Sequence, residues 1–568
     1  MSDTTFVNKS LPLIEANWLN EVNDHLYHDT PVTGATLHDA EVLSYTPAGS
    51  GAVETTVQAK LRESVSVADF GASPSATGAV NSAAFQAALD FHPHICIPPG
   101  DYALDSAITT TNKAVKIEGA GIGVTTLTFN GTNGLVFSQD NDSYHVTVCD
   151  LSLKQAGAGV GKAIYYDGSG QIVGATVQNR TSPRMRVENV NLAGSSTADT
   201  TGWEYGIEGY NLHHVTVFNV TVTGKYTTNL YDCDTIAAFY FHTDGNATEV
   251  EVDNCWAFYV QHSVKVSGIE GVFVTRCTFV AVVNGVTAAN TSPEPHIIVS
   301  DSHIAAYTTC IALTYSNQAD VHNNLLYSRS DGVTDATAIS MVDCNYCRVT
   351  GNTVVDANVT YAIDGIMLSK SAATTSANTI IANNFQAVRT GISIGAGCQN
   401  NQVANNNYVT VVTRIIDSGI KTKKEDRFTR CNNTGTFDVV GTGAAVAATF
   451  NQVVSGTEEN WNVADPTKIT ALLPGVYRVH AHAEFPSNAT GIRRIEIRKN
   501  GVRSVGFPAV CVNAVSGYDT ICNVTSGDLY LVGTDYITLV LAQSSGGDLT
   551  IAANYTWLSL EYVGPNYA

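Results

Sequence analysis

A chain of 568 residues is too long for one ordinary compact core, unless the core grows along an axis as it does in repeat proteins. Only 14% of the residues are charged, and the abundance of Gly, Tyr, Val, Thr and Asn favours β-structure over long amphipathic helices. The net charge of −21 argues against nucleic acid as a partner, and the lack of a long apolar run argues against insertion into a membrane.

The N-terminal region, residues 1–63, is expected to be a short adaptor followed by a linker. Residues 11–23, LPLIEANWLNEVN, have the apolar spacing of an amphipathic helix that buries Trp18 and Leu19. The first ten residues show no basic segment followed by an apolar run, so we expect no signal peptide. Twelve cysteines in such a chain favour reduced thiols, and the lone C-x-x-C pair lacks the second pair that a zinc knuckle needs.

One convincing helix is expected at residues 81–91, just before the repetitive part of the chain. Asn81 is the expected N-cap, because an Asn side chain can accept from the free backbone N–H groups of the first turn. The apolar side chains on one face of this helix would cover the open end of a solenoid. Those side chains belong to Ala84, Phe85, Ala88 and Leu89.

The central region repeats one pattern ten times: a short apolar-alternating strand, a turn residue and a second short strand. The spacing of the turn residues returns to 22, which is typical of a solenoid with three strands per coil and scattered loop insertions. Asn, Asp and Gly suit these turns because they tolerate left-handed backbone angles, and stacked Asn side chains can bond from coil to coil. The turn residues are Asp150, Asn189, Asn219, Asn254, Arg276, Asp301, Asn323, Gly351, Asn383 and Asn405. We therefore expect a parallel β-helix over residues 64–415.

The C-terminal region changes character. The repeat stops near residue 415, and residues 416–430 are polar and are expected to be a linker. Residues 431–568 alternate in the manner of antiparallel strands, with a hairpin signal at Lys499-Asn500-Gly501. This part of the chain is expected to be a β-sandwich, which makes the fold class all-β.

Four segments of the chain resemble known families. Val67–Ala72, Pro98–Tyr102 and Ile117–Gly121 resemble the first coils of pectate-lyase-like right-handed parallel β-helices, which are common in bacteriophage tailspikes. The family pattern usually has acidic residues after the first of these segments, whereas residues 73–80 are nearly uncharged here. Residues 11–23 are similar to the virion-attachment region of many phage tail-fibre and tailspike proteins.

The end of the chain carries a further resemblance. The order of Pro474–Val479, Lys499–Gly501 and an apolar last strand resembles trimeric jelly rolls of the tumour-necrosis-factor type. Such modules trimerise spikes or bind sugar. Together the resemblances imply a homotrimeric tailspike on the phage virion, attached to the tail or baseplate by its N-terminus and directed at a bacterial surface polysaccharide, either capsule or O-antigen.

The chemistry is expected on side chains that point outward from the strand opening each coil, because no P-loop, Ser-His-Asp or H-E-x-x-H motif is found. Later coils carry mainly Thr, Ser and Ala at these outward positions, so the reactive groups are concentrated on about four coils. In pectate-lyase-like enzymes the same sheet usually carries the active site. The candidate residues here are Tyr165, Asp167, Glu208, Tyr210, Tyr240, His242 and Lys265.

Two chemistries fit this cluster. Glycoside hydrolysis needs two carboxyl groups, and Glu208 could pair with Asp167, Asp234 or Asp244, with the acid form of Glu208 favoured if burial desolvates it. The acidic net charge favours this reading. Elimination on a uronate-containing chain needs a base and a cation, which Tyr240 or His242 and Lys265 could provide.

Substrate binding is expected from aromatic rings and from a second face. Tyr165, Tyr210 and Tyr240 could stack on sugar rings. Arg186 and Glu251 point outward from the strand before the turn and are expected to contact the substrate, although charges there also suit a solvated or trimer-contact face. No metal or cofactor is expected. The alternatives are a receptor-binding spike without enzymatic activity and a free bacterial pectate lyase.

Overall fold

The structure of the chain is a computed structural model with two compact units, residues 1–289 and 290–568. The segment 1–25, where an attachment helix was expected, lies outside the described part. Within the described ranges no helix is both long and apolar enough to cross a membrane. The described residues are 40–41, 43–139, 144–169, 185–196, 200–225, 233–328, 336–356, 363–424, 428–456, 460–471, 474–503 and 506–564.

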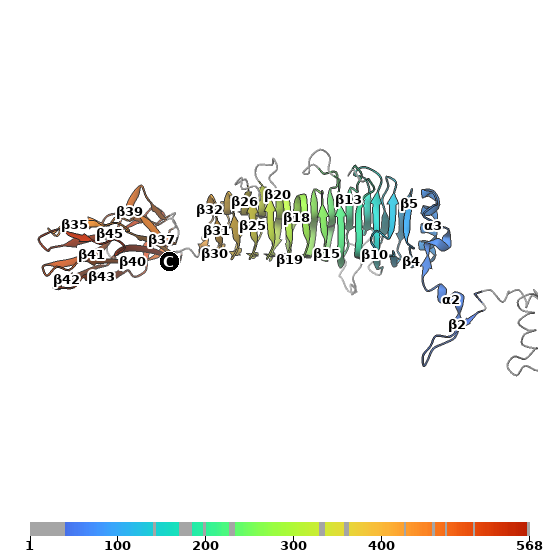
Figure 1. Cartoon of the computed structure of the whole chain (residues 1–568), viewed down its shortest axis with the longest axis horizontal. Coiled ribbons are helices and arrows are strands. Elements are labelled where there is room, and N and C mark those ends of the chain that lie inside the picture. Colours follow the sequence, from blue (N-terminus) through green and yellow to red (C-terminus); the bar gives the residue numbers. More distant parts are fainter. Residues whose placement is uncertain are drawn as a thin grey trace, which may run out of the picture. The chain divides into compact units, whose positions relative to one another are not determined.

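Parallel strands of successive coils form three faces in the first unit, which confirms the β-helix (Figure 1). Face 1 comprises β6 (Ile108–Thr111), β9 (Leu135–Ser138), β11 (Lys162–Asp167), β13 (Tyr205–Tyr210) and the first halves of β15 (Ala237–Asp253) and β17 (His262–Thr275). Face 2 comprises β4 (His94–Cys96), β7 (Val115–Glu118), the first halves of β10 (Val146–Gln155), β12 (Met185–Gly194) and β14 (Val215–Thr223), and the second halves of β15 and β17. Face 3 comprises β5 (Gly100–Leu104), β8 (Thr125–Phe129), the second halves of β10, β12 and β14, and β16 (Trp256–Phe258).

The same parallel pairing is found in the second unit. Three series of paired strands, β20-β23-β26-β29-β32, β21-β24-β27-β30-β33 and β22-β25-β28-β31, build its coils. Two strands precede these series in the chain, β18 (Thr278–Pro295) and β19 (Ile297–Ser300). The strands of the three series are β20 (His303–Asn317), β21 (Asp320–His322), β22 (Leu325–Ser328), β23 (Ala336–Val342), β24 (Arg348–Thr350), β25 (Thr353–Asp356), β26 (Ile363–Ser369), β27 (Thr379–Ile381), β28 (Asn384–Gln386), β29 (Thr390–Ile394), β30 (Gln402–Ala404), β31 (Asn407–Val409), β32 (Thr413–Asp417) and β33 (Lys423–Lys424).

The turn between faces 2 and 3 is left-handed, as the sequence predicted. Nine of the ten turn residues have φ between 50° and 67°. The prediction was wrong at Asn383, because Ala382 has the positive φ of 56° and Asn383 is buried. Asn383 instead belongs to a ladder of four Asn side chains inside the coils: Nδ2 of Asn324, Asn352 and Asn383 donates to Oδ1 of Asn352, Asn383 and Asn406 respectively, each at 3.0 Å. The Asn side chains therefore do bond from coil to coil.

The predicted capping helix is present but begins earlier. The helix α3 runs from Gly78 to Phe91 and follows β1 (Ser44–Tyr45), β2 (Thr55–Thr56), α2 (Val57–Leu61) and β3 (Val65–Ser66). Its N-cap is Thr77, whose side chain accepts from Val80 N, so the prediction of Asn81 was wrong. Asn81 lies inside the helix, where its buried Oδ1 accepts from Ser73 N at 2.9 Å. The predicted apolar face is buried, and α3 lies against β5 at the first coils (Figure 1).

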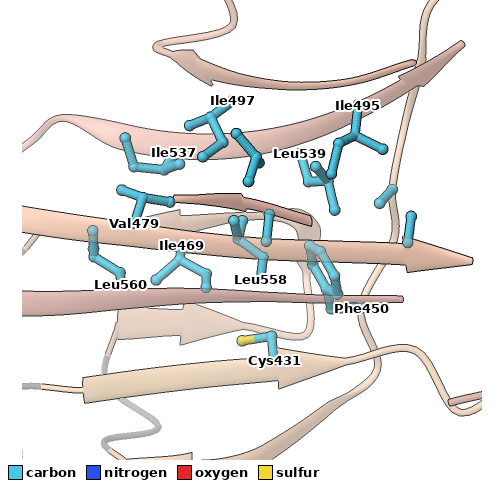
Figure 2. Close-up of a cluster of buried hydrophobic side chains, with 14 of the residues drawn as sticks. Cys431, Phe450, Ile469, Val479, Ile495, Ile497, Ile537, Leu539, Leu558 and Leu560 are labelled. Atoms are coloured by element: carbon cyan, nitrogen blue, oxygen red, sulfur yellow. The ribbon is translucent and has the colours of Figure 1, made fainter. Parts of the chain in front are cut away.

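Two antiparallel sheets follow the coils in the second unit and share one apolar core (Figure 2). Cys431, Val479 and Leu558 come from the first sheet, and Ile495 and Leu539 come from the second. The first sheet comprises β37 (Gln452–Gly456), β34 (Phe428–Asn432), β47 (Thr556–Gly564), β40 (Gly475–Phe485), β43 (Thr520–Thr525) and β44 (Leu529–Leu531), and the second comprises β38 (Trp461–Asn462), β39 (Asp465–Thr470), β45 (Tyr536–Gln543), β41 (Ile492–Lys499), β42 (Ala509–Asn513) and β36 (Val446–Ala447). Because β33 and the start of β34 fall within 416–430, that segment is partly strand.

Candidate functional site

Face 1 brings the expected reactive residues into two parallel rows. Tyr165, Glu208, Tyr240 and Lys265 are partners in consecutive strands, so they form one row that runs from coil to coil. Asp167, Tyr210, His242 and Ser267 form the second row. Neighbours within a row are about 4.8 Å apart along the axis, and the rows are two residues apart along each strand. The residues that the sequence analysis expected to point outward therefore lie in register on face 1.

A closely packed core holds the rows in place from beneath. Phe239 and Phe241 point inward from β15, and both rings are buried. Gly209 on the preceding coil leaves the room that Phe241 needs, because a Cβ there would lie 2.9 Å from the Phe241 ring. Burying such a ring stabilises a fold by about 1.5–3 kcal/mol, so the backbone that presents Glu208, Tyr240 and His242 is firmly anchored.

Glu208 is a buried carboxylate held between the side chains of Lys162 and His242. Only 6% of the residue is exposed. Its Oε2 lies 3.0 Å from Lys162 Nζ, and its Oε1 lies 3.2 Å from His242 Nε2. Burial is the largest single influence and raises the pKa of Glu208, but the hydrogen bonds and charges of His242 and Lys162 together outweigh it, so the pKa lies below its usual value. The expectation that desolvation would favour the acid form is therefore wrong.

His242 lies among aromatic rings. Its ring stacks on Tyr240 with centroids 4.3 Å apart and planes 12° apart, and the Tyr210 ring is 4.9 Å away. Tyr240 in turn stacks on Tyr205 at 5.8 Å. Burial and the nearby Glu208 carboxylate raise the pKa of Tyr240, and burial together with surrounding acidic groups raises the pKa of Tyr205 to about 12. These phenols remain protonated at neutral pH, so they can donate a proton but cannot act as a ready base.

Two lysines lie over the tyrosine rings. Lys162 Nζ is 3.7 Å from the centre of the Tyr165 ring, and Lys265 Nζ is 5.0 Å from that of Tyr240. A cation over an aromatic face is stabilised by the ring's quadrupole. Burial is also the main reason why the pKa of Tyr165 is raised to about 12. Lys162 is already paired with Glu208, so Lys265 is the cation that can meet an anionic substrate.

The other expected carboxylates have partners of their own. Asp167 accepts from Ser169 N at 2.9 Å, Asp234 pairs with Lys225, and Asp244 accepts from the Tyr210 hydroxyl. The recorded contacts of Glu208 are with Lys162 and His242 rather than with any of these groups. The structure thus brings together a carboxylate, an imidazole and phenols, with Asp167 two positions along the adjacent strand from the partner of Glu208.

A separate groove lies on face 2, and it holds the expected residue Glu251. The groove has a volume of about 380 Å³, within the range of small-ligand sites. His214 Nδ1 lies 2.6 Å from Glu249 Oε2 at one side, and the half-buried Phe273 ring offers an apolar surface next to Glu251. Arg186 lies on the same face, but its guanidinium pairs with Glu188 at 2.7 Å. Arg186 and Glu251 are therefore not part of the face 1 cluster.

Lys162 and Tyr205 belong to the cluster although the sequence did not single them out. Strict alternation from the outward Tyr165 would point Lys162 inward, because the two residues are an odd number of positions apart. The strands instead bury two successive residues, Ala163 and Ile164 in β11, so Lys162 also points outward. The same interruption recurs in β13 between Tyr205 and Glu208. In the sequence, this interruption is marked by a small residue, Ala163 in β11, that recurs directly after the outward Lys162 position in successive coils.

Comparisons with known proteins give distant resemblances. Residues 174–426, less than half of the chain, match the family model of NosD, described as a periplasmic copper-binding protein. No curated protein matches the chain significantly.

Among solved structures, phage tailspikes are found. Tailspike protein 3 of bacteriophage CBA120 is 15% identical, with 72% of this chain and 68% of that chain covered and a TM-score of 0.49. The A-module of the mannuronan C-5 epimerase AlgE6 of Azotobacter vinelandii is 14% identical, with 63% and 99% covered and a TM-score of 0.41. The globular domain of the zebrafish complement 1qA protein is 14% identical, with 25% and 100% covered and a TM-score of 0.20. The β-helix assignment rests on the parallel strand register rather than on these resemblances.

Proposed function

We propose that this chain is a phage tailspike that binds an acidic polysaccharide on a bacterial surface and cleaves it by β-elimination on face 1. The observation that carries the proposal is His242, which is backed by the ionised Glu208, stacked on the protonated phenol of Tyr240 and followed by Lys265 on the next coil. The attachment-like N-terminal segment and the jelly-roll-like C-terminal region support the spike, its homotrimeric assembly and its place on the virion.

The chemistry follows from the position of each group. His242 accepts the proton from C5 of a uronate residue, and Glu208 stabilises the imidazolium that forms. The electron pair of the C–H bond becomes the C4=C5 double bond, and the bond from C4 to the glycosidic oxygen breaks. Tyr240 returns a proton to the leaving oxygen, because the Tyr210 proton is already shared with Asp244. Lys265 pairs with the uronate carboxylate and so stabilises the negative charge that develops beside it.

Hydrolysis at the same cluster has less support. It needs a carboxylic acid that stays protonated near neutral pH until it donates to the leaving group. Glu208 is instead held in the ionised form by Lys162 and His242. In the proposed elimination the Glu208 carboxylate stabilises the imidazolium of His242 and does not react with the sugar.

The purified full-length chain should shorten a uronate-containing capsule or O-antigen when it is incubated with polysaccharides from a panel of bacteria. Elimination leaves an ultraviolet-absorbing unsaturated uronate, and the fragment masses sum to the mass of the parent chain without added water. Fragments that gain one water per cut would show hydrolysis and contradict elimination. If the chain binds the polysaccharide without shortening it, the protein is a receptor-binding spike without enzymatic activity, and the proposed cleavage is contradicted.

His242→Ala should abolish cleavage and keep polysaccharide binding. Asp364→Asn on β26 is the control, because Asp364 is a largely buried outward carboxylate that pairs with Arg389 at 2.7 Å and belongs to the second unit. Equal loss of cleavage in both variants would indicate a general effect on folding and would contradict the assignment of His242.

A further inference from the structure

A second cluster of reactive side chains lies on face 2, far along the chain from the proposed catalytic residues. It is formed by β4 and β7, which pair with each other, and Figure 1 shows β4 near the α3 helix. Cys96 on β4 and Glu118 on β7 are direct partners in adjacent strands, and His94 lies two positions before Cys96 on the same side. Alternation in a strand thus places an imidazole, a thiol and a carboxylate on one outward surface.

The donor atoms of these three residues converge. His94 Nε2 lies 2.9 Å from Glu118 Oε2 and 3.7 Å from Cys96 Sγ, and all three donor atoms lie within 4.8 Å of one another. About a third of the His94 and Glu118 side chains is exposed, so an ion can reach them from solvent.

We propose that His94, Cys96 and Glu118 bind a zinc ion, with water in the fourth position. Zinc takes nitrogen, sulfur and oxygen donors in tetrahedral geometry, at about 2.0 Å, 2.3 Å and 2.1 Å respectively. A regular tetrahedron with those bond lengths places nitrogen and sulfur about 3.5 Å apart and nitrogen and oxygen about 3.4 Å apart. These two distances therefore change by about 0.5 Å or less, and the sulfur–oxygen distance, which lies within 4.8 Å, needs to reach about 3.6 Å; rotation of the partly exposed side chains allows these changes.

The ion would clip the two coils nearest the α3 cap to each other. Its charge is balanced by the thiolate and the carboxylate, while the thiol proton leaves to solvent. One group competes with it: Lys116 Nζ lies 2.7 Å from the same Glu118 oxygen. Because about two fifths of the Lys116 side chain is exposed, the ammonium can move into water when the ion binds.

Cobalt(II) is the first probe, since a cobalt–thiolate bond gives an absorption band that carboxylate and imidazole ligands do not give. The full-length chain should show this band and tetrahedral cobalt bands, and zinc should displace the cobalt and raise the unfolding temperature. Cys96→Ser should abolish the band and lower zinc affinity at least tenfold. Cys511→Ser, which removes the exposed cysteine of the C-terminal region, should leave both unchanged.

Lys116→Met gives a second readout, since removing the competing ammonium should tighten zinc binding severalfold. An adventitious thiol complex would not respond to this change. No cobalt–thiolate band in the unaltered protein, or a band that survives Cys96→Ser, would overturn the proposal. Weaker or unchanged zinc binding in Lys116→Met would also contradict it.

Discussion

The pairing of Glu208 with Lys162 and His242 makes Glu208→Gln the most informative substitution. At 3.0 Å and an effective dielectric constant of about 20, the attraction between Glu208 and Lys162 is about 5.5 kcal/mol before desolvation. Both groups are largely buried, and their desolvation offsets more than half of this value. We therefore expect a coupling free energy of about 2 kcal/mol in a double-mutant cycle of Glu208→Gln and Lys162→Met.

Local stability is the quantity to measure, because a solenoid can open one coil at a time and need not unfold in one step. Hydrogen exchange of the β11 and β13 amides reports the opening free energy of these coils in each variant. Glu208→Gln should destabilise them by leaving Lys162 unpaired, and the double variant should recover part of the loss. Additive effects, with a coupling below about 0.5 kcal/mol, would refute the ion pair.

Activity should separate from stability in the same variants. Glu208→Gln should lower kcat by about 100-fold or more, because the imidazolium loses its partner and the amide can hold His242 in the wrong tautomer. The double variant should regain stability without regaining activity. Polysaccharide affinity should stay within about twofold throughout, since Glu208 is too buried to contact the sugar. Recovered activity in the double variant would contradict the role assigned to the carboxylate.

Three further predictions concern the ladder, the groove and acid stability. Asn352→Ala removes four buried hydrogen bonds and should destabilise its coils by about 4 kcal/mol. Asn407 is exposed, so Asn407→Ala should destabilise its coil by less than about 0.5 kcal/mol, and hydrogen exchange measures the opening free energy in both variants. Phe273→Ala should weaken polysaccharide binding by about 1–2 kcal/mol in calorimetry without changing kcat, and unchanged affinity would exclude the groove as a sugar site. Hydrogen bonding to Arg276 lowers the pKa of Asp253 from its usual value of 3.8. The pair therefore stabilises the fold above pH 3.8, and this stabilisation is lost as the pH falls through the lowered pKa of Asp253. Arg276→Ala should flatten the acidic side of a plot of unfolding temperature against pH.

The coil architecture was predictable because its local requirements are strict. A left-handed turn costs most residues about 1–2 kcal/mol, so Asn, Asp and Gly recur where the chain must turn. The error at Asn383 is instructive, because two adjacent Asn residues, Asn383 and Asn384, follow the actual turn at Ala382. The buried Asn383 bonds Asn406 and the Val349 carbonyl, and these contacts depend on neighbouring coils that local sequence does not reveal. The start of α3 has a local cause instead, because the Thr77 side chain accepts from Val80 N and caps the helix four residues before Asn81.

The rows of the site were predictable, whereas the ionisation of its groups was not. Period-two alternation correctly placed Glu208 and His242 on one surface. The protonation state of Glu208 depends on Lys162, which strict alternation assigns to the wrong side of the strand. A pair of buried residues in β11 and again in β13 shifts the phase of the pattern by one position, and that shift brings in Lys162, which together with His242 lowers the pKa of Glu208.

The location of the charges also bears on the choice of substrate. The net charge of −21 favoured hydrolysis over elimination, but exposed charges more than about 8–10 Å away are largely screened at physiological salt. On face 1, Lys162 neutralises Glu208 and Lys265 lies beside Tyr240, while the carboxylates of Asp167 and Asp244 accept from Ser169 N and the Tyr210 hydroxyl. A uronate that approaches this part of the face meets a cation beside the base and the proton donor. The local arrangement therefore favours an anionic sugar at the reacting position, even though the chain as a whole is acidic.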